Sequence, residues 1–166
     1  MTRAPRRFLR CLLGLAATAV FLGLSTGPAE AGDITIFLSK ARPDELWADG
    51  YGAALGSTWF KLVTFEAEVA RLPGELPDSG MTSFTGAALL SAPLPLVTPY
   101  GGFGFGIYRQ TLSDENDHGT LRAFILGGKV TLGLVVIRAD YRKLRLSGPP
   151  RLELDHRYSL GAGLSF

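Results

Sequence analysis

The sequence predicts an all-β protein, specifically a transmembrane, antiparallel, up-and-down β-barrel of eight strands. After residue 31 the chain contains eight segments of about ten residues in which apolar residues alternate with small or polar ones. A period of two is typical of strands with two different faces. The connections between these segments alternate between long polar stretches and short ones. The last segment keeps its alternation up to Phe166, without the polar tail that ends many soluble domains.

The first 31 residues have the pattern of a secretory signal peptide. Four arginines between residues 3 and 10 precede an apolar run from Cys11 to Leu24, and Ala29-Glu30-Ala31 forms an A-x-A cleavage site before Gly32. The apolar run is shorter than the ~20 residues that a transmembrane helix needs. We therefore expect a signal peptide over 1–31 and a barrel domain over 32–166.

Removal of the signal peptide changes the charge and the cysteine content. Of 17 basic and 15 acidic residues, four arginines and Glu30 leave, so the mature chain has 13 basic and 14 acidic residues. A nearly neutral chain gives no electrostatic reason to expect nucleic acid as a partner. Cys11, the single cysteine, also leaves. The mature protein then has no disulfide, no thiol nucleophile and no cysteine metal site.

The first half of the mature chain contains four predicted strands, over 33–39, 50–60, 62–71 and 82–92. In the first strand, Ile34, Ile36 and Leu38 share one face. In the third strand, two glutamates alternate with apolar residues. The alternation is weakest in the fourth strand.

The second half contains four more predicted strands, over 99–109, 121–131, 135–144 and 156–166. In the fifth strand, aromatic residues face away from glycines. The two faces of the sixth strand are hard to separate. The seventh strand places Arg138, Asp140 and Arg142 on one face, opposite Ile137 and Tyr141. The eighth strand ends the chain.

The connections predict how the barrel is oriented in a membrane. Long polar links with Pro or Gly follow the odd-numbered strands, over 40–49, 72–80, 110–119 and 145–153. Shorter links follow the even-numbered strands. Long loops on one side and short turns on the other are typical of outer-membrane barrels. Both chain ends are then expected on the periplasmic side, with the long loops outside the cell.

The chain resembles the small OmpA-like or opacity-protein-like outer-membrane β-barrels. The resemblance is carried by the signal peptide and by "PYGGFGFGIYR", "IRADYRKLRL" and the terminal "RYSLGAGLSF". It implies export to the outer membrane of a bacterium with two membranes. It also implies an assembly signal, read by the barrel-assembly machinery, at Tyr158, Leu160, Leu164 and Phe166. Other expected partners are outer-membrane lipids, periplasmic chaperones during biogenesis and an extracellular ligand at the loops, and the protein is expected to be a monomer.

The alternation also suits a soluble, lipocalin-like periplasmic barrel that binds a ligand inside, with its apolar face inward. The face opposite the apolar one decides between a membrane barrel and a soluble barrel, because it consists mainly of Gly, Ala, Ser and Thr. Small residues suit the narrow interior of an eight-stranded barrel better than a hydrated surface. The aromatic residues fall in the other set, which we expect to face lipid. They include Trp59, Phe65, Phe103, Phe105 and Tyr141.

The charged residues of the strands form the most informative polar group. We expect them to project into the lumen as a polar cluster. Its members are Glu66, Glu68, Lys129, Arg138, Asp140, Arg142 and Arg157. Buried charges need partners, and strands three and seven lie opposite each other in a barrel of eight. The cluster is therefore expected to be either an ion-paired plug or, alternatively, a narrow ion-conducting path.

The sequence offers little for catalysis. His156 and Ser159 are three residues apart in a strand, so their side chains point to opposite faces, and His118 lies in an acidic link. That link lacks the spacing of a calcium loop. We expect no catalytic residue, no cofactor and no metal. A structural or surface-interaction role in the outer membrane is the favoured interpretation, with a small pore and a soluble ligand-binding barrel as alternatives.

Overall fold

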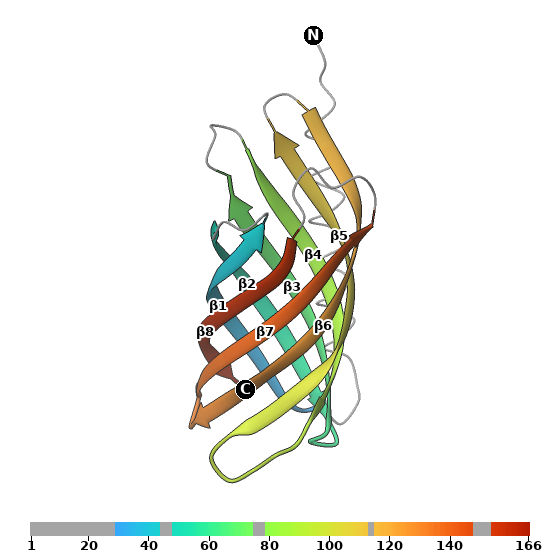
Figure 1. Ribbon diagram of the computed structural model, residues 1–166. Helices are drawn as coiled ribbons and strands as arrows, with labels where there is room; N and C mark the ends of the chain where they lie inside the picture. Colours follow the sequence, from blue (N-terminus) through green and yellow to red (C-terminus); the bar gives the residue numbers. More distant parts are fainter. Residues whose placement is uncertain (1–28, 44–47, 75–78, 113–114, 148–153) are drawn as a thin grey trace, which may run out of the picture.

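A computed structural model describes residues 29–43, 48–74, 79–112, 115–147 and 154–166. These residues form one closed antiparallel barrel in which each strand pairs with the next and β8 pairs with β1 (Figure 1). The strands are β1 (Ala29–Pro43), β2 (Ala48–Trp59), β3 (Val63–Pro73), β4 (Gly80–Ser91), β5 (Thr98–Leu112), β6 (Glu115–Leu132), β7 (Val135–Ser147) and β8 (Leu154–Ser165). The predicted fold class and strand number are confirmed. The described residues contain no helix long and apolar enough to cross a membrane.

The barrel has two different ends. At the turn end, where β8 finishes, the links are short and span residues 60–62, 92–97 and 133–134. Phe60 and Lys61 adopt positive φ values of 53° and 58°, and the Leu62 N–H donates to the Trp59 carbonyl over 3.1 Å. Two consecutive positive φ values are characteristic of a tight hairpin turn. At the opposite end, the loop end, lie the predicted long links, parts of which are outside the described residues.

One predicted long link is mostly strand. The prediction placed a loop over 110–119, but β5 continues to Leu112 and β6 begins at Glu115. This hairpin projects beyond the other strands at the loop end, at the top of Figure 1. Asn116 holds it together, because its side-chain oxygen accepts from Arg109 Nη2 at 2.8 Å and from Thr111 Oγ1 at 2.9 Å. Polar composition did not prevent strand pairing here, since both faces of a projecting hairpin can be hydrated.

The first strand is also longer than expected. β1 begins at Ala29, so it includes the three residues of the predicted A-x-A site. Residues 1–28 lie outside the described residues. The signal peptide and its cleavage therefore stay predictions.

The strands separate an apolar outer face from an inner face. On the outer face Leu38 is 73% exposed and Phe105 is 66% exposed, whereas on the inner face Thr35 and Arg142 are each 1% exposed. The alternation continues around the barrel. Large apolar side chains thus cover the outside, which is the arrangement that a lipid bilayer requires. A soluble barrel of the lipocalin type has the reverse arrangement.

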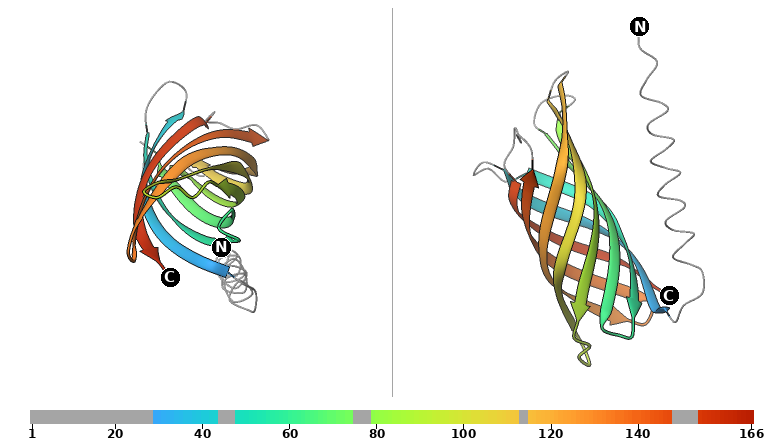
Figure 2. Two further views of the ribbon diagram at one scale, coloured as in Figure 1. Left: turned by 90° about the horizontal axis from the view of Figure 1, so that it is seen from below. Right: turned by 90° about the vertical axis from the view of Figure 1, so that its right-hand side faces the viewer.

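Closure of the barrel depends on the junction of β1 and β8. The Gly32 N–H donates to the Phe166 carbonyl at 2.7 Å, and the Phe166 N–H donates to the Gly32 carbonyl at 2.9 Å. Further along this junction, a Cβ atom on Gly163 would lie 1.9 Å from the Ile34 carbonyl oxygen. A glycine is therefore required there for the two strands to approach each other. Figure 2 shows the barrel from below in its left view and the tilt of the strands from the side in its right view.

Apolar side chains also occupy part of the lumen, and we call this group of side chains the apolar wall. It consists mainly of inward-facing residues of β4, β5 and β6, namely Met81, Ala87, Leu89, Tyr100, Tyr108, Leu121, Ala123 and Ile125. The small residues expected in the lumen are present on β5, at Gly102, Gly104 and Gly106, but β4 and β6 add large apolar residues that were not expected there. They were not expected because β4 and β6 have large apolar residues on both faces, which makes their alternation ambiguous.

The outer face generates the first testable prediction. Phe105→Arg places a charge near the middle of the apolar outer face, which costs about 2–4 kcal/mol where that face contacts the hydrocarbon midplane. We expect a matching loss in the free energy of unfolding, measured by urea titration of protein folded into lipid vesicles. Phe105→Leu is the control and should change it little. Unchanged stability of the arginine variant in vesicles would show that Phe105 does not face lipid.

Candidate functional site in the barrel lumen

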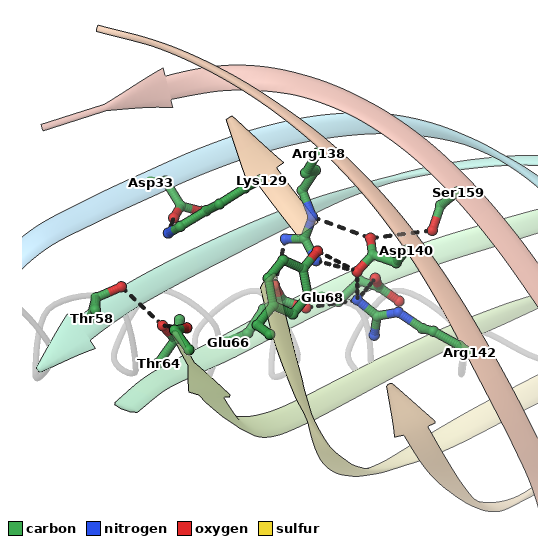
Figure 3. A network of polar contacts seen from close by, with 12 residues as sticks. Asp33, Thr58, Thr64, Glu66, Glu68, Lys129, Arg138, Asp140, Arg142 and Ser159 are labelled. Carbon is green, nitrogen blue, oxygen red and sulfur yellow. Dashed lines mark hydrogen bonds and ion pairs between the residues drawn. The ribbon is translucent and has the colours of Figure 1, made fainter. Parts of the chain in front are cut away.

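The lumen contains a group of charged side chains, the central network, that connects opposite walls (Figure 3). Glu66 and Glu68 project from β3, and Arg157 projects from β8. Arg138, Asp140 and Arg142 project from β7. β3 and β7 are four strands apart in the closed order of eight, so they face each other across the lumen. The structure thus brings together six of the seven residues that the sequence assigned to the lumen cluster.

Two arginines reach across the barrel from β7 to β3. Arg138 Nη1 lies 2.5 Å from Glu66 Oε2. Arg142 Nη2 lies 2.7 Å from Glu66 Oε1 and 2.8 Å from Glu68 Oε2. Glu66 therefore receives one guanidinium on each of its oxygens, and it links the two arginines.

The remaining members complete the pairing. Arg138 also holds Asp140, through Nε at 3.2 Å and Nη2 at 2.7 Å. Arg157 Nη2 donates to Glu68 Oε1 at 2.5 Å. Three guanidinium groups thus face three carboxylates, and the central network has no net charge. Because guanidinium and carboxylate groups can form several charge-assisted hydrogen bonds, these contacts have a defined geometry.

An aromatic ring lies on each flank of the network. The Tyr100 hydroxyl donates to Asp140 Oδ1 at 2.7 Å, and the Arg138 guanidinium lies 5.4 Å from the centre of the Tyr100 ring. On the other flank, the Arg157 guanidinium lies 5.4 Å from the centre of the Phe37 ring. These distances are within the range of cation–π attraction. The charges are therefore held between apolar surfaces in a poorly hydrated place.

Lys129 forms a separate pair nearer the turn end. Its Nζ lies 2.9 Å from Asp33 Oδ2, and the side chains are 19% and 7% exposed. A small cavity lies between this pair and the central network, lined also by Thr64, Leu89 and Ser91. The cavity has room for roughly one water molecule. The lysine is thus in the lumen, as the sequence indicated, but it does not join the other six residues.

Pairing of opposite charges is what makes these buried groups tolerable, although Arg142 Nε and Arg157 Nε have no hydrogen-bond partner. Transferring a charge out of water costs several kcal/mol, and only good geometry with a partner offsets it. Every guanidinium and carboxylate in the network has at least one oppositely charged partner. The arrangement can fill and hold the lumen. It offers no side chain poised to attack a substrate.

Sequence reasoning missed three residues of the site, namely Asp33, Phe37 and Tyr100. A signal for each was present. Asp33 and Phe37 alternate with the apolar residues Ile34 and Ile36, which places them on the inner face. Tyr100 is an even number of residues from the inward glycines at 102, 104 and 106 of its strand, which places it on the inner face.

The residues expected to face lipid lie on the outer face. Phe65, Phe103 and Phe105 are exposed, whereas Trp59 and Tyr141 are half-buried. The residues expected to form an assembly signal also lie on that face, and all are exposed: Tyr158, Leu160, Leu164 and Phe166. Their recognition during assembly stays a prediction.

The histidines lie away from the network. His156 is on the outer face, where its Nδ1 lies 2.7 Å from the Tyr141 hydroxyl. Ser159 is on the inner face, where its hydroxyl donates to Asp140 over 3.4 Å. The two side chains thus point to opposite faces, as their spacing predicts. His118 is exposed near the loop end. Within the described ranges, no three His, Cys, Asp or Glu side chains are grouped so that they could hold a metal ion.

Comparison with solved structures places this architecture among known barrels. The N-terminal β-barrel domain of Pseudomonas aeruginosa OprF aligns with a TM-score of 0.65 and 17% identity, over 82% of this chain and 97% of that one. Neisserial surface protein A aligns with a TM-score of 0.60 and 16% identity, over 81% and 94%. The chain has the fold of the eight-stranded outer-membrane barrels. No protein-family model matches the sequence. No curated protein matches it either.

One structure with the same fold is an enzyme. The outer-membrane enzyme PagL aligns with a TM-score of 0.50 and 12% identity, over 80% of this chain and 98% of that one. At such low identity the likeness extends to the fold alone. Function must therefore be argued from the residues of this chain.

The pairing within the central network generates the second prediction. Arg138→Gln leaves Glu66 and Asp140 without one of their cations, and breaking a buried pair in this way costs about 3–5 kcal/mol. Lys40→Gln is the control, because Lys40 pairs with Asp49 at 3.2 Å on the surface, where a pair contributes about 1 kcal/mol or less.

Both variants are compared by urea titration in the same detergent, with heat-modifiable gel mobility as the measure of the folded fraction. We expect a loss in the free energy of unfolding for Arg138→Gln that is several times larger than for Lys40→Gln. Equal losses would mean that the network contributes no more than a surface ion pair.

Proposed function

We propose that this protein spans the outer membrane of a bacterium as a closed barrel with a structural or surface-interaction role, and that it is not an enzyme. The observation that carries the proposal is the division of side chains between the two faces. Large apolar residues are exposed outside, and the paired charges are inside. This distribution is unfavourable for a protein dissolved in water and favourable for one surrounded by lipid.

The closed backbone ladder supports the same location. A strand edge exposed to hydrocarbon would leave N–H and C=O groups without partners, so open sheets do not span membranes. Here β8 pairs with β1 from Asp33 to Pro43 on the first strand, which leaves no edge along the barrel. The likeness to OprF and Neisserial surface protein A is consistent with this placement.

The filled lumen supports a structural role over transport. The central network crosses the lumen from β3 to β7, and Arg142 in it is 1% exposed. The apolar wall occupies the β4–β6 side. An ion would have to displace paired arginines or pass along apolar side chains, and both processes are costly.

A narrow pore is the second candidate, favoured by one observation. The polar cavity next to Lys129 and Asp33 reaches Glu66 and Arg138 of the network. If Arg138 and Arg142 changed their partners, this cavity could extend toward the loop end. The lumen would then conduct ions along a charged path.

The third prediction tests location and orientation. We expect Ser79→Cys and Asp117→Cys, both near the loop end, to react with a membrane-impermeant maleimide on intact cells. Pro95→Cys lies in an exposed link at the turn end, and it should react only after the outer membrane is disrupted. Cys11 is the single natural cysteine and lies in the predicted signal peptide. If that peptide is removed as we propose, the mature protein contains no competing thiol. The opposite labelling pattern would reverse the orientation, and recovery of the protein in the soluble fraction would reject a membrane location.

The fourth prediction separates the closed barrel from the pore. Purified protein in planar lipid bilayers should show no stable conductance steps. Arg142→Ala with Arg157→Ala removes two of the three cations that fill the centre, and this variant should show cation-selective steps. Arg71→Ala, on the outer face, is the control and should remain silent. Stable conductance of the unaltered protein would favour the pore.

A further inference from the structure

The apolar outer face ends in a border of basic residues on the loop-end side. These residues occupy outward-facing positions near the loop ends of β1, β3, β5, β6 and β7, and all are exposed: Lys40, Arg42, Arg71, Arg109, Arg122, Lys143 and Arg145. Two of them have local polar partners, since Lys40 pairs with Asp49 and Arg109 donates to Asn116. Exposed acidic residues at the same end of the described strands are Asp49 of β2 and Asp155 of β8, so basic residues outnumber acidic ones there.

Four of these residues gather over adjacent strands and form what we call the basic patch, namely Arg42, Arg122, Lys143 and Arg145. In the strand register Arg122 lies directly opposite Arg145, and Lys143 lies opposite His156, which in turn lies opposite Arg42. The patch thus extends from β6 across β7 and β8 to β1. Cross-strand neighbours have Cβ atoms about 4.5–5.5 Å apart, so their charged groups can act on one ligand.

Within the patch, the described acidic side chain nearest to these cations in sequence and register is the exposed Asp155 of β8, next to His156. In the part of the chain that the structure describes, none of its four cations forms an ion pair with an acidic side chain. Like charges placed directly opposite each other in a sheet are destabilising. The Arg122 and Arg145 positions therefore create a site of positive potential that an anion would stabilise.

The surface next to the patch is aromatic and apolar. The rings of Tyr141 and Tyr158 lie 5.2 Å apart, and the Tyr141 hydroxyl bonds His156 at the edge of the patch. In the register, Tyr158 lies opposite Lys40, and the next outward residue of β8 is Leu160. Aromatic residues in such positions mark the boundary between hydrocarbon and headgroups in outer-membrane barrels. The cations thus lie where headgroups begin, with room for acyl chains against the face below.

We propose that the basic patch binds the phosphate groups of an anionic lipid in the leaflet around the loop end. This proposal rests on the proposed function, because it requires the barrel to be in a membrane. Arginine forms paired hydrogen bonds with phosphate oxygens, and two of the arginines lie side by side. The apolar face below the patch distinguishes a lipid from a free anion, because only a lipid contacts both surfaces.

The test uses purified protein folded in phosphatidylcholine nanodiscs, with bisphosphorylated lipid A as the probe and native mass spectrometry or titration as the readout. The variant is Arg122→Gln with Lys143→Gln and Arg145→Gln. The control is Lys61→Gln with Arg71→Gln and Arg109→Gln, which removes the same charge elsewhere on the exposed surface. A basic residue near a charged membrane surface contributes about a fivefold change in binding. We therefore expect a loss on the order of a hundredfold for the patch variant and a much smaller loss for the control.

Three results would overturn the lipid assignment. The first is equal binding of lipid A by the unaltered protein and the patch variant. The second is equal affinity for lipid A and for its phosphate-free form, which would indicate apolar contact alone. The third is displacement of lipid A by inorganic pyrophosphate at an equal concentration, which would indicate a free-anion site. Before the binding experiment, heat-modifiable gel mobility shows whether the protein has folded and inserted into the nanodiscs. Failure to insert would contradict the proposed function, whereas the three results above would contradict only the lipid assignment.

Discussion

The pairing of every strand's backbone N–H and C=O groups around one closed sheet determines most of this structure. Eight strands achieve that pairing by closing on themselves, and the closing contacts continue to the last residue, where Phe166 and Gly32 exchange hydrogen bonds. A barrel of eight strands is so narrow that side chains fill its interior. Closure therefore decides what the lumen can contain, and it is also what the proposed location in a membrane requires.

Within that narrow space, the charged side chains separate two apolar regions. The apolar wall lies on the side of β4 to β6, and a smaller group of Phe37, Ala54 and Ala70 lies on the side of β1 to β3. Low hydration strengthens the attraction between the guanidinium and carboxylate groups, and it also raises the cost of any change of partner. The result is an interior whose contents are fixed by geometry. This is consistent with a protein that acts through its outer surface and loops.

Much of this organisation could be predicted from the sequence, because period-2 alternation assigns residues to faces without any knowledge of packing. Glu66, Arg138 and Asp140 were assigned to the lumen in this way. The pairing of Glu66 with two arginines could not be predicted, since it depends on the tilt of the strands, which alternation does not report. Tyr100 was missed for a related reason. An aromatic residue suits either lipid or a buried hydrogen bond, and only the position of Asp140 decides between them.

Two strands, β4 and β6, have large apolar residues on both faces, and their inward residues could not be assigned from the sequence. In β4 and β6 the inward Leu89 and Ile125 are as apolar as the outward Phe84 and Phe124. A strand buried on one side by protein and on the other by lipid needs no polar face, so its alternation disappears. Likewise, the polar residues of 110–119 indicated a loop, although a hydrated hairpin accepts polar residues on both faces.

The span of the central network along the chain has a consequence for how the protein folds. Its contacts join residues that are 72, 76 and 89 positions apart in sequence. Glu66 and Glu68 are made early in synthesis, but their partners arrive only with β7 and β8. Until then these side chains are either hydrated or protonated, because an unpaired charge in an apolar environment is costly. The first hairpins thus cannot complete their own charge pairing, and the interior of the barrel reaches its final state only when the last two strands join β3.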